Sequence, residues 1–164
     1  MQNFTVMIES AQFRQVLGHW STGVAIVATV TRSGEPCGLT ANAVAAVSLV
    51  PPLVLACIER GADSHDALRD AGIFTINILA QGSEAIARRF AGDDAGGKFL
   101  GVPHHTGSSG APVLDDALAW VDCRVHAAHD AGDHTIFVGA VLAGGTRAGE
   151  PLLYHRGRYS RLTQ

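Results

Sequence analysis

The chain contains several short segments rich in β-branched and aliphatic residues, and most of them are separated by only a few turn-forming residues. VAIVATVTR at residues 24–32 is apolar almost throughout, and SGEP at 33–36 supplies turn chemistry after it. PLVLACIE (52–59), IFTINIL (73–79) and TIFVGAVLAG (135–144) have the same character. Segments this short and this closely spaced predict a mainly β protein.

A further segment, LAWVDCRVHAAH at residues 118–129, alternates with a period of two. One face would carry Ala119, Val121, Cys123, Val125 and Ala127, and the other Trp120, Asp122, Arg124 and His126. This pattern predicts a half-buried antiparallel strand, which DAGDH at 130–134 would turn back into the strand that follows.

The first helix is expected to begin at Ser10, which can act as its N-cap. Phe13, Val16, Leu17 and Trp20 follow at i, i+3, i+4 and i+7, which places them in one apolar stripe. We therefore expect this helix to pack against another apolar surface.

Two further helices are predicted between strands. SHDALRDAG (64–72) would be capped by its serine and ended by its last glycine, and SEAIARRFAG (83–92) repeats this arrangement. Residues 93–112 show no clear period and predict a long loop, while PLLYHRGRYSRL (151–162) predicts a last strand. Strands outnumber helices without a regular βαβ order. A single domain over residues 1–164, built as a small antiparallel barrel with helices over its open ends, is the expected fold.

Charge and composition limit the classes of partner. The 164 residues carry a formal net charge of −3 and contain no block of Lys or Arg, which argues against general affinity for nucleic acid or anionic membranes. The N-terminal segment MQNFTVMIES resembles neither a signal peptide nor a membrane span. We therefore expect a cytoplasmic protein whose partners are small molecules or other proteins.

The cysteines indicate the redox environment of the protein, and the apolar content bears on its association. Cys37, Cys57 and Cys123 form no C-x-x-C pair and lie in strand-like surroundings, which suits reduced thiols in a reducing compartment. Hydrophobic residues make up 47% of the chain and charged residues 16%. This favours a buried subunit interface, although one large core would give the same totals.

Common catalytic and metal-binding motifs are missing from the sequence. It lacks G-x-S-x-G, H-E-x-x-H, a P-loop lysine motif, and G-x-G-x-x-G after a strand. Of the eight histidines, His104 and His105 are adjacent in a predicted loop, while His126 and His129 would point to opposite faces of a strand. These spacings do not match known zinc sites, so we expect no metal.

Residues 38–55, GLTANAVAAVSLVPPLVL, contain no ionisable side chain and are unusually small at the first few positions. A backbone covered so thinly can lie against a planar heterocycle, with Thr40, Asn42 and Ser48 adding side-chain hydrogen bonds. The alternative is a barrel strand whose small residues face a packed helix.

Three other places combine polar groups with strand or helix ends. Ser64 could bind phosphate or act as an ordinary N-cap. Arg88, Arg89 and Lys98 could reach an anion or form a solvated helix end. His134 would place an imidazole at a hairpin tip, where it could also be a simple turn residue.

Taken in order, these elements resemble the short-chain flavin reductase family, the reductase partners of two-component flavin-dependent monooxygenases. The resemblance covers residues 13–162 and depends on TAN at 40–42, a serine-containing helix start, RFAG and KF, GDH at 132–134, and PLLYHRGRY. It implies an antiparallel Greek-key split β-barrel, usually a homodimer. It also implies hydride transfer from NADH or NADPH to FMN or FAD, and delivery of reduced flavin to a monooxygenase.

The resemblance also implies roles for individual residues. The flavin ring and ribityl chain would lie along Leu39, Thr40, Ala41, Asn42 and Ser48, over the strand with Ala56, Cys57 and Ile58. Ser64 and His65 match the phosphate-binding turn, and Arg89, Phe90, Lys98 and Phe99 match segments near the phosphate and the far end of the cofactor. His134 matches the histidine beside the nicotinamide, and Tyr154, Arg156 and Gly157 match a C-terminal strip near both cofactors.

Two positions depart from the family pattern. Val50 stands where relatives often carry an acidic residue. Asp63-Ser64-His65 stands where they often carry a run of hydroxyl residues, and this second departure leaves the choice between FMN and FAD open. Three other functions remain as alternatives: a non-enzymatic flavin-binding electron-transfer protein, an FMN enzyme resembling pyridoxine-phosphate oxidase, and a plain ligand-binding barrel.

Overall fold

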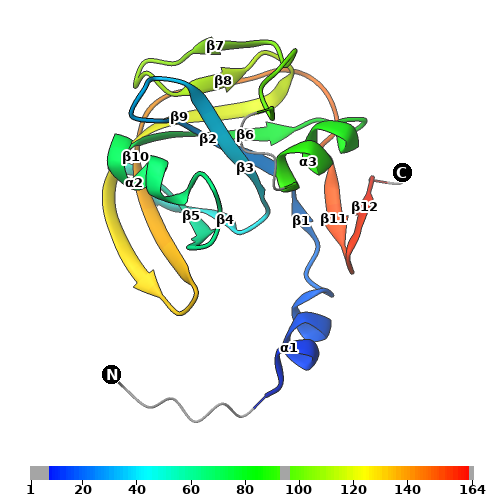
Figure 1. Cartoon of the computed structure of the whole chain (residues 1–164). Coiled ribbons are helices and arrows are strands. Elements are labelled where there is room, and N and C mark those ends of the chain that lie inside the picture. Colours follow the sequence, from blue (N-terminus) through cyan, green and yellow to red (C-terminus); the bar gives the residue numbers. More distant parts are fainter. Residues whose placement is uncertain (1–7, 93–96, 163–164) are drawn as a thin grey trace.

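The computed structural model describes residues 8–92 and 97–162 (Figure 1). Its helices are α1 (Ser10–Leu17), α2 (His65–Ala71) and α3 (Glu84–Ala91). Its strands are β1 (Thr22–Gly23), β2 (Ala25–Val30), β3 (Pro36–Ala41), β4 (Val44–Leu49), β5 (Pro52–Glu59), β6 (Ile73–Leu79), β7 (His104–Thr106), β8 (Pro112–Leu114), β9 (Ala117–Ala131), β10 (His134–Thr146), β11 (Leu153–His155) and β12 (Arg158–Ser160).

Seven strands form the main sheet in the order β3-β2-β6-β9-β10-β5-β4, and every pair is antiparallel. The two edge strands, β3 and β4, are consecutive in the chain and are joined by Asn42 and Ala43. The Cys57 N–H donates to the Ala43 carbonyl oxygen at 2.9 Å, which closes this corner. The sheet therefore curls into a split antiparallel barrel, and the predicted fold class is confirmed (Figure 1).

The continuous apolar character of β2 follows from burial on both faces. Val24, just before the strand, and Ile26 belong to one buried cluster, whereas Ala25 and Val27 belong to a second. The first cluster lies under α3 and includes Phe90, and the second fills the barrel between the main strands. A strand with two buried faces needs no alternation, which explains the sequence of this segment.

The long hairpin of β9 and β10 agrees with the alternation read from the sequence. Its strands pair from His134↔Ala131 to Thr146↔Ala119, with two register shifts. Gly132 has φ of 65° at the turn, a conformation that favours glycine. The predicted turn between the two strands is confirmed.

Two predicted segments differ from the structure. In the region expected to be one long loop, β7 and β8 pair as a hairpin, while residues 93–96 lie outside the described residues. The expected single last strand is a tight hairpin of β11 and β12. In both cases pairing with distant residues decides the outcome: the Thr75 hydroxyl donates to the Pro112 carbonyl oxygen, and β11 pairs with β1.

Helix α1 begins one residue earlier than expected, and its side chains are not buried against the rest of the described chain. Glu9 occupies the N-cap position, Ser10 is the first helical residue, and none of the helix residues is buried. Figure 1 shows α1 standing away from the barrel. The expected packing of its apolar stripe is therefore not found among residues 8–92 and 97–162. Among the described residues, no helix has the length and apolar content needed to span a membrane.

Candidate functional site

The closed corner of the barrel borders a cavity of about 430 Å³, which we call the main cavity. It is bounded by the end of β3, the β5–α2 loop, the end of α3 and the start of β10. Its lining residues are Leu39, Thr40, Ala41, Asn42, Ala43, Cys57, Glu59, Gly61, Ala62, Asp63, Phe90, Ala91, Gly92, Lys98 and His134. A volume of this size suits a small-molecule ligand.

The small residues of β3 have two separate causes. Gly38 packs so closely against β2 that an added Cβ would lie 2.7 Å from the Val27 carbonyl oxygen. Further along the strand, the Thr40 hydroxyl donates to the Ala87 carbonyl oxygen of α3 at 2.6 Å. Internal packing on β2 therefore accounts for Gly38, and packing on α3 for Thr40, while residues 39–43 border the main cavity.

The β9–β10 hairpin brings His134 into the lining of the main cavity, next to the end of β5. His134 pairs in register with Glu59 at the end of β5, and the Arg60 N–H donates to the Asp133 carbonyl oxygen at 3.0 Å. His134 Nδ1 lies 2.7 Å from a carboxylate oxygen of Asp133. This hydrogen bond, and secondarily the charge of the histidine, lowers the pKa of Asp133 below its ordinary value.

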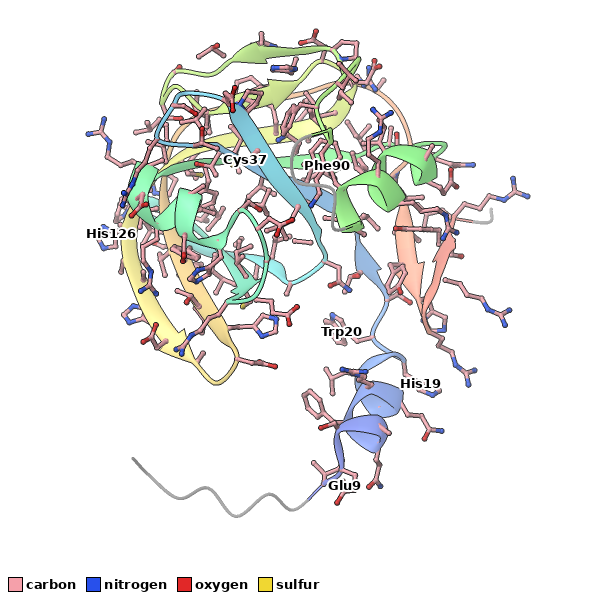
Figure 2. All side chains as sticks on the ribbon, viewed as in Figure 1. Glu9, His19, Trp20, Cys37, Phe90 and His126 are labelled. Carbon is pink, nitrogen blue, oxygen red and sulfur yellow. The ribbon has the colours of Figure 1, made fainter. Side chains whose placement is uncertain are left out.

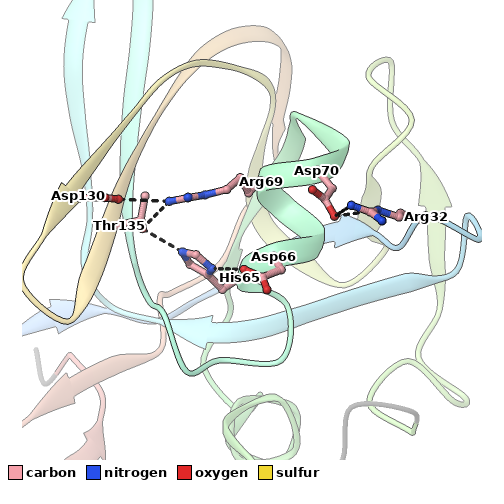
Figure 3. Close-up of polar contacts among 7 residues, drawn as sticks. All are labelled: Arg32, His65, Asp66, Arg69, Asp70, Asp130 and Thr135. Carbon is pink, nitrogen blue, oxygen red and sulfur yellow. Dashed lines mark hydrogen bonds and ion pairs between the residues drawn. The ribbon is translucent and has the colours of Figure 1, made fainter.

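Polar contacts join α2 to the β9–β10 hairpin and to Arg32, which follows β2 (Figure 3). Arg69 contacts Asp130 at 3.2 Å and Thr135 at 3.3 Å, and Arg32 pairs with Asp70 at 2.9 Å. His65 is buried, with Nδ1 2.8 Å from Asp66 and Nε2 2.9 Å from the Thr135 hydroxyl. Its imidazole thus contributes to this network rather than to the lining of the main cavity.

A second cavity of about 390 Å³ shares Asp63 and Lys98 with the main cavity. Ser64 lines it and is only 3% exposed, yet its hydroxyl oxygen has no hydrogen-bond partner among the described residues. Ser64 occupies the N-cap position of α2, as predicted, but its side chain makes no capping hydrogen bond. A buried hydroxyl without a partner is energetically unfavourable, so this oxygen is suited to meet a ligand.

Lys98 gives the junction of the two cavities a positive charge although it is only 5% exposed. Desolvation raises the pKa of Cys37, in the second cavity, to about 11, an effect that the charge of Lys98 partly opposes. Among the described residues that line these two cavities, Lys98 is the one Lys or Arg. A hydroxyl and a cation that line the same cavity are groups that can bind a phosphate.

The remainder of the main cavity carries carboxylates and uncharged groups. Glu59 and Asp63 lie on its loop side, and Cys57 lies on its β5 side. Burial raises the pKa of Cys57, so this thiol is neutral at physiological pH. Among the described residues that line this cavity, no nucleophile is activated by an adjacent base, so the arrangement is suited to binding and orienting a ligand.

The structure brings together many, but not all, of the residues predicted from the sequence. Those lining the main or second cavity are Leu39, Thr40, Ala41, Asn42, Cys57, Ser64, Phe90, Lys98, Phe99 and His134. Tyr154 lies beside them, because it lines a smaller cavity of about 190 Å³ together with Thr40 and Asn42.

The other predicted residues lie elsewhere in the fold. Ala56 and Ile58 are fully buried in the barrel interior, and Ser48 is on β4 outside these cavities. Arg89 donates to the Leu100 carbonyl oxygen at 2.8 Å. Arg156 and Gly157 form the β11–β12 turn, both with positive φ, and the Arg156 N–H donates to the Gly18 carbonyl oxygen at 2.9 Å.

Sequence reasoning missed the acidic and small residues of the β5–α2 loop, namely Glu59, Gly61, Ala62 and Asp63. Their position directly before Ser64 was an available signal. It also missed much of the second cavity, including Glu35, Cys37 and His104. No pattern in the sequence links these three, because they come from separate strands and loops. Within residues 8–92 and 97–162, His, Cys, Asp and Glu side chains form no cluster suited to a metal ion.

Comparisons with known proteins agree with this geometry. Residues 17–163 match the family model described as a flavin reductase like domain. The chain is 44% identical over 161 residues to a flavin reductase (NADH) of Kitasatospora aureofaciens, covering 94% of this chain and 83% of that protein. It is 40% identical over 158 residues to the reductase component of a 4-nitrophenol 4-monooxygenase/4-nitrocatechol 2-monooxygenase of Rhodococcus opacus, covering 96% and 84%.

A solved structure is similar over almost the whole chain. The NADH:FAD oxidoreductase SgcE6 of Streptomyces globisporus, in complex with NAD and FAD fragments, has a TM-score of 0.88 and 36% identity. The match covers 99% of this chain and 98% of that one. The resemblance inferred from the sequence is thereby confirmed.

Proposed function

Because the chain belongs to the flavin reductase-like family, we propose that it is an NAD(P)H:flavin oxidoreductase that reduces FMN or FAD. Reduced flavin would then pass to a partner monooxygenase. The relatives named as an NADH-dependent flavin reductase and as a monooxygenase reductase component support both parts of this proposal.

The observation that carries the proposal is a pair of cavities that share Asp63 and Lys98 in their walls. The second of them also contains the buried Ser64 hydroxyl, which has no hydrogen-bond partner among the described residues. A flavin nucleotide has the matching parts, since it combines a planar ring system with a phosphate. The ring would occupy the main cavity against residues 39–43 and Cys57, and Ser64 and Lys98 would bind the phosphate.

Hydride transfer from nicotinamide to flavin is chemistry that the two cofactors supply, so the residues of this chain bind and orient them. The backbone at residues 39–43 would offer hydrogen-bonding groups to the polar edge of the ring, and Phe90 adds an aromatic ring to the cavity lining. His134, whose Nδ1 lies within hydrogen-bond distance of Asp133, lines the cavity and would position the nicotinamide.

The first test is the oxidation of NADH and NADPH by the purified protein in air, with and without added FMN, FAD or riboflavin. We expect oxidation that depends on added flavin. A protein that retains flavin and oxidises neither nucleotide would be an electron-transfer protein instead. A spectrum free of flavin at every added concentration would indicate a barrel for another ligand.

We further propose that the chain forms a single domain and a homodimer in the cytoplasm, without binding nucleic acid or membranes. The apolar composition and the exposed apolar side chains of α1 and β4 support association. Light scattering should give twice the chain mass of 17.1 kDa. A monomeric mass at micromolar concentration would contradict the homodimer and leave the proposed activity untouched.

A further inference from the structure

The main cavity contains a carboxylate close to the place assigned to the flavin ring. Glu59 is the last residue of β5, and it lines the cavity as Cys57 does. Side chains alternate along a strand, so these two residues lie on the same face of β5, roughly 6.6 Å apart along the strand. An added Cβ on Gly61 would lie 3.9 Å from Glu59 Oε1, so the carboxylate lies beside the β5–α2 loop that also lines the cavity.

No described residue neutralises the charge of Glu59 by an ion pair. Glu59 is exposed, and none of the ion pairs within residues 8–92 and 97–162 includes it. The next residue, Arg60, pairs with Asp130 at 3.3 Å. His134 lies opposite Glu59 in the β5–β10 register, but its Nδ1 lies 2.7 Å from Asp133. The nearby basic groups are therefore engaged with other carboxylates.

The cation of the site lies where it would meet the phosphate. Lys98 lines both cavities, and Ser64 lines the second. Figure 2 labels one residue of each cavity, Phe90 of the main cavity and Cys37 of the second. The phosphate of a flavin nucleotide carries the same charge whether the ring is oxidised or reduced. Its contacts with Lys98 and Ser64 therefore favour neither oxidation state.

The charge of the ring, in contrast, changes in the reaction. NADH gives FMN a hydride, that is, two electrons and one proton: a C–H bond of the nicotinamide breaks, an N–H bond of the flavin forms, and NAD⁺ is left. The flavin ring thereby gains one negative charge, which it keeps until a proton from water follows. A carboxylate beside the ring disfavours a second negative charge and has little effect on the uncharged oxidised ring.

We propose that Glu59 makes the main cavity distinguish the two oxidation states of flavin, so that the oxidised substrate binds more tightly than the reduced product. This inference rests on the flavin reductase activity proposed above. Because Glu59 is exposed and its charge is screened by water, the preference should be roughly threefold to tenfold. Reduced flavin would then leave the site because of a charge that this chain supplies.

Glu59→Gln tests the proposal, because it keeps the shape of the side chain and removes its charge. Titrations without oxygen, with oxidised FMN and with FMN reduced by dithionite, give the two Kd values. We expect the wild type to bind oxidised FMN roughly threefold to tenfold more tightly, and the variant to lose most of this difference through tighter binding of reduced FMN. In about 1 M salt the wild-type ratio should also fall, because salt screens exposed charges.

The reduction potential of bound FMN gives an independent measurement. A threefold to tenfold preference for the oxidised form lowers the two-electron potential of bound FMN below that of free FMN by roughly 15–30 mV. Glu59→Gln should raise the potential of bound FMN by a similar amount. Glu59→Lys, which reverses the charge, should bind reduced FMN more tightly than oxidised FMN.

Glu150→Gln is the matched control, since Glu150 is exposed, lies between β10 and β11, and lines neither cavity. It removes the same charge from the protein and should keep the wild-type ratio of Kd values. An unchanged ratio in Glu59→Gln would overturn the proposal, as would the same change in Glu150→Gln or a wild type that binds reduced FMN at least as tightly as oxidised FMN. Flavin-dependent NADH oxidation in these cases would leave the proposed activity standing. A protein that binds neither form of FMN, FAD or riboflavin would contradict the proposed function itself.

Discussion

Ser64→Ala should raise the stability of the free protein while weakening its affinity for FMN. Replacing a serine N-cap by alanine ordinarily costs about 0.5–2 kcal/mol of stability. Here the Ser64 hydroxyl makes no capping bond and has no partner among the described residues. Leaving a buried hydroxyl unsatisfied costs roughly 1–3 kcal/mol, so its removal should stabilise the free protein by up to about 1 kcal/mol once the small void is counted.

A gain of that size corresponds to a rise in Tm of roughly 2–4 °C for a chain of this length. The FMN phosphate would lose one hydrogen bond to a charged group, worth about 1.5–3 kcal/mol, so FMN should bind roughly tenfold to a hundredfold more weakly. Riboflavin, which lacks the phosphate, should bind both proteins equally.

The assay combines thermal unfolding without ligand with titrations of FMN and riboflavin against wild type and variant. Riboflavin serves as the internal control, because a general disturbance of the main cavity would weaken both ligands. A lower Tm together with unchanged FMN affinity would refute the reasoning. It would show that the Ser64 hydroxyl caps α2 in solution and that the phosphate lies elsewhere.

Other predictions concern the main cavity and the core. Asn42→Leu keeps the bulk of a cavity-lining side chain but removes its amide, so flavin titration should show roughly threefold to tenfold weaker binding with an unchanged circular dichroism spectrum. His134→Ala should lower kcat/KM for NADH roughly tenfold to a hundredfold and leave flavin affinity nearly unchanged. If the variant instead has the NADH kinetics of the wild type, His134 is only a turn residue. If His134 positions the nicotinamide, activity should not follow a histidine ionisation, and a pH–rate profile that loses such a step in the variant would instead indicate proton donation. Burial, and then the charge of Asp122, raises the pKa of Cys123 from 9.0 to about 12. Stability should therefore be retained below about pH 9 and fall above it, because the unfolded thiol ionises first. Urea midpoints at about pH 7 and about pH 10 should show a smaller alkaline loss in Cys123→Ala, and an equal loss would contradict the assignment.

The sequence predicted the strands whose pattern depends on local rules. The alternation at residues 118–129 and the glycine turn after it located the β9–β10 hairpin, since the pleat imposes a period of two. Gly72 ended α2 as expected, with φ of 66°. The β7–β8 pairing and the β11–β12 hairpin were missed, because contacts with distant strands decide both.

The sequence predicted those residues of the candidate site that belong to one continuous segment. It missed residues that come together only where several segments meet. The small residues at 39–42 and the helix start at Ser64 were visible as interruptions of apolar strands. Side-chain direction was not visible: Cys57 faces the main cavity while Ala56 and Ile58 face the core, and the ring of His65 is held by Asp66 and Thr135. Glu59 and Asp63 were missed because they line the main cavity only where the β5–α2 loop lies near the tip of the β9–β10 hairpin. The sequence does not show that these two segments are close.

By itself, the sequence determined the mainly β class, the lack of common catalytic motifs and the family resemblance, because these follow from composition, periodicity and the order of short motifs. Tertiary structure decided that β3 and β4 meet at a corner, that Ser64 is buried without a partner in the described chain, and that Lys98 joins two cavities. It also decided that α1 is not buried against the described part of its own chain, although its apolar stripe predicted packing. Burial and hydrogen-bond satisfaction depend on residues far apart in the chain, and a local pattern fixes which side chains are apolar but not which surface covers them.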